Sequence, residues 1–185
     1  MTAPKWLANY DDGIPSTLEP YPKQTLADYL REAAVRWPDR PALLFKGSTV
    51  TYRKLEDESN ALGAALSEMG VGRADRVAIC LPNCPQFLIA EFAAWKVGAI
   101  VSPFNPTYSE REMEDALRTT GAETVIVLNR FYGKVKSVQS RTSIKRISPI
   151  VCRFHRSTSV MSCGIGAIPL ISTRFTDSIK PMAST

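Results

Sequence analysis

Three residues of metal-binding types lie close together near the end of the chain: Cys152, His155 and Cys163. Thiolates and imidazole nitrogens bind zinc, but a structural zinc site takes four such ligands, usually in two closely spaced pairs. Three ligands at irregular spacing do not fit this arrangement. His155 is the only histidine and has no carboxylate near it in the sequence, so a catalytic dyad is not indicated either. We interpret the three residues as incidental.

A pair of cysteines and a short glycine run could suggest redox chemistry or nucleotide binding, but both favour a structural interpretation. Cys80 and Cys84 flank a turn after an apolar run, where packing is more common than the exposed, lowered-pKa thiols of redox sites. The run Gly164-Ile165-Gly166 is similar to part of a dinucleotide-binding loop, but it lacks the third glycine and a preceding strand. We interpret it as a turn.

Charged residues form two groups with different signs. The acids are Glu110, Glu112, Glu114 and Asp115, and the bases are Arg130, Lys134, Lys136, Arg141, Lys145 and Arg146. The acids resemble a metal site, but acids are favourable in the first turn of a capped helix, so we predict a solvated helix face. The bases could bind nucleic acid or anionic lipid nonspecifically, although Phe131 and Tyr132 are too few aromatics for a stacking platform. We therefore assign no catalytic, cofactor-binding or metal-binding residue.

The first half of the chain predicts two amphipathic helices and two short strands. Thr25 suits the N-cap of a helix with one apolar stripe, made of Leu26, Tyr29, Leu30, Ala33, Ala34 and Trp37. Residues 42–45 and 50–52 are typical of strands. Thr51 suits the cap of the next helix, whose apolar side carries Leu55, Leu62, Leu66 and Met69.

Strands and helices alternate after this point. Strands are predicted at residues 77–81, 99–102 and 124–128, and helices at residues 86–97 and from Ser109 to Gly121. The first of these strands is a continuous apolar run, as expected for a parallel strand covered on both faces. Ser109 and Glu112 have the spacing of a capping box. The alternation predicts an α/β fold with a partial, doubly wound parallel sheet.

Composition fits one globular domain in a reducing compartment. Of the 185 residues, 44% are hydrophobic and 22% are charged. The N-terminus lacks a basic segment followed by an apolar run, and the least polar stretch, residues 160–171, is shorter than the about 18 apolar residues of a membrane span. Four cysteines do not make a disulfide framework in such a chain. We therefore expect a cytoplasmic protein with no transmembrane segment.

The net charge of +5 is unevenly distributed. Residues 1–129 carry 13 Lys/Arg against 17 Asp/Glu, whereas residues 130–185 carry 10 Lys/Arg and a single acid, Asp177. From Ser148 onward, 11 of 38 residues are Ser or Thr, and apolar residues follow neither a helical nor a strand period. We expect this basic tail, residues 148–185, to be disordered.

Several segments together resemble one enzyme family. The run LPNCPQFLIAEFAAWKVGAIVSPFNPTYSEREMEDAL, residues 81–117, resembles the first part of AMP-forming acyl-CoA synthetases. Residues 50–55 and 95–103 are similar to two packing motifs of these adenylate-forming enzymes, with Val97 where alanine is usual. The opening, residues 6–30, resembles bacterial long-chain fatty-acid:CoA ligases. The resemblance runs from Trp6 to Ile147.

The resemblance implies a two-step reaction. In the family, a fatty acid attacks ATP to give acyl-AMP and pyrophosphate, and CoA then displaces AMP. Such chemistry needs a phosphate-binding loop, Mg²⁺ and a lysine near the developing charge. We find no Ser/Thr-Gly-rich loop followed by Pro-Lys-Gly and no aromatic-Gly-x-Thr-Glu element. Although the family uses ATP, Mg²⁺ and CoA, we expect no cofactor bound by this chain and no activity from it.

These expectations give a three-part organisation. Residues 1–24 are a lead-in, residues 25–147 are the truncated N-terminal subdomain of an AMP-binding ligase, and residues 148–185 are a tail produced by a reading-frame change near Ile147. The alternative is a noncatalytic interaction module whose basic tail binds anions weakly and nonspecifically. Apart from the fatty acid, ATP and CoA implied by the resemblance, the sequence indicates no definite partner.

Overall fold

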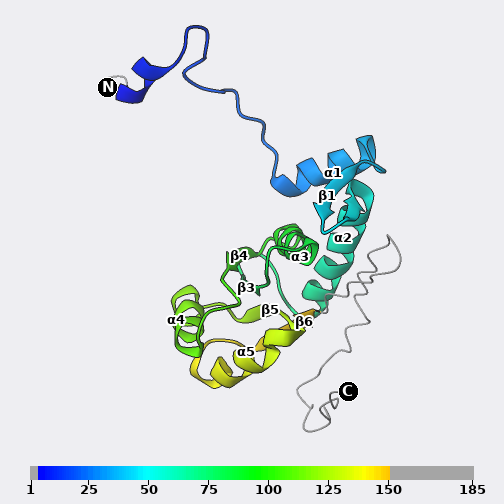
Figure 1. Ribbon diagram of the computed structural model, residues 1–185, viewed down its shortest axis with the longest axis vertical. Helices are drawn as coiled ribbons and strands as arrows, with labels where there is room; N and C mark the ends of the chain where they lie inside the picture. Colours follow the sequence, from blue (N-terminus) through cyan, green and yellow to red (C-terminus); the bar gives the residue numbers. More distant parts are fainter. Residues whose placement is uncertain (1–3, 151–185) are drawn as a thin grey trace.

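The computed structural model describes residues 4–150 and contains a parallel sheet with helices on both faces (Figure 1). Its helices are α1 (Leu26–Arg36), α2 (Tyr52–Glu68), α3 (Pro85–Lys96), α4 (Glu110–Thr120) and α5 (Tyr132–Val138), and its strands are β1 (Pro41–Phe45), β2 (Ser48–Thr51), β3 (Arg76–Cys80), β4 (Ile100–Pro103), β5 (Thr124–Leu128) and β6 (Arg146–Ile150). Short 3-10 turns occupy Lys5–Asn9, Asn129–Phe131 and Gln139–Arg141. The predicted α/β fold with a doubly wound sheet is confirmed.

The main sheet has the strand order β4-β3-β5-β6, and every neighbouring pair is parallel. From β3 the chain passes through α3 to β4 at one edge, and then returns through α4 to β5 on the other side of β3. Helix α5 connects β5 to β6. Helices α1, α2 and α3 lie on one side of the sheet, and α4 and α5 lie on the other (Figure 1). Right-handed crossovers require this change of face when the direction of winding reverses.

Strand β3 separates two hydrophobic cores. Val77 and Ile79 face the core formed with α2 and α3, whereas Ala78 and Cys80 face the core formed with α4 and α5. All four side chains are at most 1% exposed. The neighbouring strand β5 repeats this alternation, with Ile126 in the first core. The continuous apolar run at residues 77–81 was therefore correctly interpreted as a strand covered on both faces.

The helix caps predicted from the sequence are confirmed. The side-chain oxygen of Thr25 accepts a hydrogen bond from the backbone N–H of Asp28, and the Thr51 side chain caps α2 in the same way. Ser109 and Glu112 form the reciprocal capping box of α4. Gly121, with φ of 60°, ends that helix in the left-handed conformation.

The apolar stripe predicted for α1 is only partly buried. Leu30 is 4% exposed and lies in the core, but Leu26 is 60% exposed and Tyr29 is 45% exposed. Trp37, just after the helix, is 38% exposed and has the guanidinium of Arg36 over its ring, 4.6 Å from the ring centre. Among residues 4–150, only one side of the predicted apolar stripe therefore packs against the body.

Two elements were not predicted: α5 and β6. Their segment is rich in lysine and arginine and follows no simple apolar period, so the sequence did not distinguish it from a solvated connection. Strand β6 pairs with β5 through Ile150, past the boundary expected at Ile147. Residues 151–185 lie outside the described part of the chain. The expected disorder of residues 148–185 therefore stays a prediction for most of that segment. None of the described helices is long and apolar enough to cross a bilayer.

Both outer strands of the main sheet carry a proline whose backbone nitrogen points to the open edge and not to the neighbouring strand. At the start of β4 the N–H of Ile100 donates to Asp75, just before β3, and just after β4 the N–H of Phe104 donates to Ile79. The alternation of a parallel ladder therefore turns the backbone nitrogen of Pro103 outward. On β6, the N–H of Arg146 donates to the residue before β5, which turns Pro149 outward. Proline offers no N–H for strand pairing. Within residues 4–150, both edges therefore disfavour the addition of another strand.

Helices α2 and α3 are joined by a nearly buried ammonium group, that of Lys96. Its Nζ lies 2.7 Å from a carboxylate oxygen of Glu56, 2.7 Å from the Ser59 hydroxyl oxygen and 2.8 Å from the Asn60 amide oxygen. The side chains of Lys96 and Glu56 are 10% and 12% exposed. The three N–H groups of the ammonium thus have three side-chain acceptors, all on α2.

We expect Lys96→Met to lower the free energy of unfolding by roughly 2–3 kcal/mol, because methionine keeps the apolar stem but leaves the Glu56 carboxylate without its cation. Urea unfolding followed by circular dichroism measures this change. The matched control is Lys145→Met, since the Lys145–Glu123 pair has the same kind of contact at 2.8 Å but side chains 64% and 41% exposed. The control should lose less than about 1 kcal/mol. Equal losses in both variants would contradict the assigned role of Lys96.

Candidate functional site

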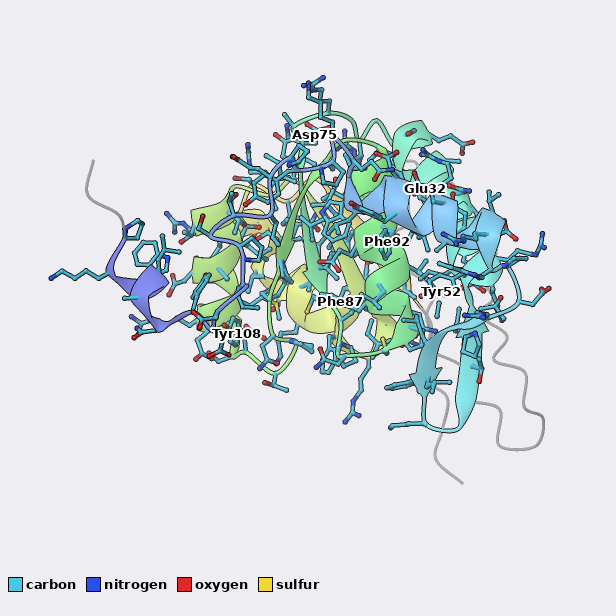
Figure 2. The ribbon with its side chains drawn as sticks, turned by 90° about the horizontal axis from the view of Figure 1, so that it is seen from above. Glu32, Tyr52, Asp75, Phe87, Phe92 and Tyr108 are labelled. Atoms are coloured by element: carbon cyan, nitrogen blue, oxygen red, sulfur yellow. The ribbon has the colours of Figure 1, made fainter. Side chains whose placement is uncertain are left out.

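A groove lies at the carboxyl ends of β3 and β4, where the chain leaves the sheet toward opposite faces. The loop after β3 leads to α3, and the loop after β4 leads to α4 on the other face. Figure 2 shows Phe87 and Tyr108 at this end of the sheet and Asp75 at the opposite end. In open α/β sheets, ligands bind beyond the carboxyl ends of the strands where the winding changes direction. This groove is therefore the candidate site.

The groove has a volume of about 570 Å³, which is within the usual range for sites of small molecules. It is lined by Leu81, Pro82, Asn83, Phe87, Pro103, Phe104, Asn105, Pro106, Thr107 and Tyr108. Aromatic rings and prolines supply most of these walls, and the polar groups are neutral. Such a lining can hold an apolar or planar group, but it offers no charged side chain for acid–base catalysis or for binding phosphate.

The wall after β4 is held in shape by contacts within its own loop. The side-chain oxygen of Asn105 accepts hydrogen bonds from the backbone N–H of Thr107 at 3.0 Å and from the Thr107 hydroxyl at 2.9 Å. The backbone N–H of Tyr108 donates to the Asn105 carbonyl at 3.1 Å. The rings of Phe104 and Tyr108 stack at 6.5 Å between centres. Asn105 is thus a structural residue whose amide oxygen is already engaged.

The acids beside this loop serve the fold. Hydrogen bonds from the Ser109 backbone and hydroxyl, together with the charge of Lys134, lower the pKa of Glu112. Hydrogen bonding from Arg141, 2.7 Å away, and the charges of Arg141 and Arg118 lower the pKa of Glu114. Residues 4–150 contain no group of three metal-ligating side chains. The interpretation of these acids as a capped helix face is confirmed.

The basic run is also engaged within the fold. Lys134 donates to the Tyr108 carbonyl, Lys136 to the Gln139 side chain, and Lys145 to Glu123. The guanidinium groups of Arg141 and Arg146 donate to Glu114 and Thr124, and that of Arg130 lies over the Phe131 ring. Each of these six cations has a contact within the chain, although the side chains of Arg141 and Lys145 stay 50% and 64% exposed. The contacts show a structural use for the run, and its nonspecific binding of nucleic acid or lipid stays a prediction.

The cysteines predicted to be structural are buried. Cys80 is 0% exposed and Cys84 is 8% exposed, and both are free thiols. Burial raises the pKa of the Cys80 thiol to about 12, despite the opposing charge of Lys134. Packing is thus favoured over redox chemistry for Cys80. Cys152, His155, Cys163 and the run Gly164–Gly166 lie outside the described residues.

The two segments that carried the family resemblance occupy packing positions. Residues 50–55 include the end of β2 and the capped start of α2. Residues 95–103 include the end of α3, the turn at Gly98 and all of β4. Lys96, in the second of these segments, donates to Glu56, Ser59 and Asn60 of α2. Of the residues in these two segments, Pro103 alone lines the groove.

Comparison with known proteins identifies related enzymes. The family described as AMP-binding enzyme matches residues 30–162. The long-chain-fatty-acid–CoA ligase of Salmonella typhimurium is 35% identical over 143 residues, which are 77% of this chain and 26% of the relative. The ligase of the same name from Bacillus subtilis (strain 168) is 35% identical over 142 residues, which are 77% of this chain and 25% of the relative.

A solved structure supports the same relationship. The crystal structure of a long-chain-fatty-acid-CoA ligase from Archaeoglobus fulgidus is similar with a TM-score of 0.64 at 26% identity, covering 81% of this chain and 31% of that chain. The present chain therefore spans about a quarter of the length of the curated relatives it matches.

We expect iodoacetamide to leave Cys80 almost unmodified in the folded chain at pH 8, because the thiolate is the reacting species and a pKa of about 12 leaves the thiol protonated. Peptide mass spectrometry should show labelling at least about a hundredfold slower than in the urea-unfolded chain, where the thiol has its ordinary pKa of about 8.5. Similar rates in the folded and unfolded chains would show that Cys80 is accessible and reactive.

Proposed function

The chain belongs to the AMP-binding enzyme family, and from this membership we propose that it is the first subdomain of a cytoplasmic long-chain fatty-acid:CoA ligase. The family match over residues 30–162 is the observation that carries the proposal. The proposed activity of the whole enzyme converts fatty acid, ATP and CoA to acyl-CoA, AMP and pyrophosphate. The groove at the carboxyl ends of β3 and β4 would form one wall of its substrate crevice.

In this proposal the chain positions substrate and does not handle the phosphate charge. Phe87, Phe104 and Tyr108 give the groove an apolar, aromatic surface that excludes water. Attack of a carboxylate on ATP brings several negative charges together, and stabilising them requires cations or aligned N–H donors. The lining contains no lysine or arginine. Mg²⁺ would offset this charge in the whole enzyme, but residues 4–150 offer no cluster of ligands for it, so we assign the chain no step through the metal.

We therefore expect the purified chain to form neither acyl-AMP nor acyl-CoA. Without the phosphate loop and the lysine implied by the family resemblance, both positioning and charge stabilisation are missing. The chain is incubated with ATP, Mg²⁺, CoA and palmitate, and AMP is measured by chromatography against a protein-free blank. The full-length Salmonella typhimurium ligase serves as the positive control.

No AMP above the blank is the expected result. AMP release that rises in proportion to chain concentration and disappears after heat denaturation would overturn the proposed inactivity. The same result would place the phosphate-handling residues within this chain.

We also propose that the last part of the chain is read in a different frame from the rest of the ligase. Residues 130–185 contain one acid, and from Ser148 onward 11 of 38 residues are Ser or Thr. Strand β6 pairs normally through Ile150, and the family match reaches residue 162 but not the end of the chain. We therefore look for the change of frame downstream of Ile150.

The encoding DNA tests this proposal directly. Translation of the other two frames beyond codon 150 should reveal a Ser/Thr-Gly-rich loop ending in Pro-Lys-Gly, followed by further ligase sequence. Sequencing of independent clones of the same gene is the control for a sequencing error. If neither frame encodes such a continuation, the change of frame is excluded, and the basic segment becomes a candidate interaction segment.

A further inference from the structure

Lys134 on α5 contacts the loop that forms one wall of the groove. Its Nζ donates to the backbone carbonyl of Tyr108 at 2.7 Å, and the lysine side chain is half-buried. Tyr108 lines the groove, whereas Lys134 comes from the connection between β5 and β6. The contact therefore links the groove wall to an element that follows it by 26 positions in the chain.

The Lys134 contact differs in kind from the other restraints on this loop. The hydrogen bonds of Asn105 with Thr107 and Tyr108 are local, because they fix the turn without fixing its place on the body. The N–H of Phe104 donates to Ile79 at 3.1 Å and fixes only the start of the loop on β3. A charged donor makes a hydrogen bond roughly twice as strong as a neutral one. Lys134 thus fixes the far end of the turn.

The charge of Lys134 has a second partner on the same wall. It contributes to lowering the pKa of Glu112, although the hydrogen bonds from Ser109 contribute more. Glu112 closes the capping box at the start of α4, immediately after the loop. One ammonium group therefore acts on both the Tyr108 carbonyl and the first turn of α4.

We propose that Lys134 is a positioning residue, which holds the Tyr108 end of the loop and thereby sets the shape of the groove. The relevance of this role to substrate binding rests on the proposed function, but the positioning itself does not. Loss of the ammonium should let the turn separate from α5 while its internal hydrogen bonds persist for part of the time. The backbone amides of Thr107 and Tyr108 report this motion, because both donate hydrogen bonds within the turn.

The test is native-state hydrogen exchange of the full chain, measured by NMR at single amides. We expect Lys134→Met to accelerate exchange at Thr107 and Tyr108 about tenfold, because one charge-assisted hydrogen bond is lost. Exchange at Ile126 in β5 should be unchanged, since this residue is 0% exposed in the central sheet. The matched control is Lys136→Met, which removes an ammonium from the same helix whose partner is the Gln139 side chain.

A conservative variant separates positioning from general stabilisation. Lys134→Arg keeps a charged donor and should restore slow exchange at Thr107 and Tyr108. The proposal is overturned if Lys134→Met leaves both amides unchanged, or if it accelerates Ile126 by the same factor, which would indicate global destabilisation. No substrate enters this experiment, so its outcome is independent of whether the whole enzyme is a fatty-acid:CoA ligase.

Discussion

The structure depends on burying β3 on both of its faces. The side chains of β3 from Val77 to Cys80 are apolar on both faces of the sheet, so helices must cover the strand on both sides. Val77 and Ile79 on one face and Ala78 and Cys80 on the other satisfy this requirement through two separate cores. Helix α3, in the first connection from β3, covers one face of the sheet, and α4 and α5, in the next two connections, cover the other. The chain therefore has to reverse its direction of winding to cover both faces of β3.

That change in winding also creates the groove. Because the loops after β3 and β4 lead to opposite faces, their side chains separate at the carboxyl ends of the strands and leave a concave surface between them. The groove is apolar where Phe87 and Tyr108 line it. Lys134 does not line the groove, but its ammonium group donates a hydrogen bond to the backbone carbonyl of Tyr108. Under the proposed function, this groove would shape a substrate crevice, and the charge of ATP would be stabilised by residues outside its lining.

Ionic contacts in the described part of this fold fix helices and turns in place. Lys96 fixes α3 on α2, and the pair of Glu114 and Arg141 ties α4 to the turn before β6. Prolines on the two outer strands add a further constraint by limiting strand addition at the edges. In a region that resembles an enzyme family, charged residues therefore need to be assigned by their contacts and not by their type alone.

The sequence by itself determined the features that depend on neighbouring residues. Thr25, Ser109 and Gly121 act within one helical turn, and the apolar run at residues 77–81 implies its own burial, so these features and the family resemblance were predictable. Only the tertiary structure revealed the partner of Lys96, the role of Lys134, the elements α5 and β6, and the exposed side of α1. These depend on which surfaces meet between segments far apart in the chain, 26 positions for Lys134 and Tyr108 and 22 for Thr124 and Arg146, and on sheet register. Local periodicity carries no information about such distant pairs, because their proximity is decided by the order of the strands and the faces on which the crossovers lie.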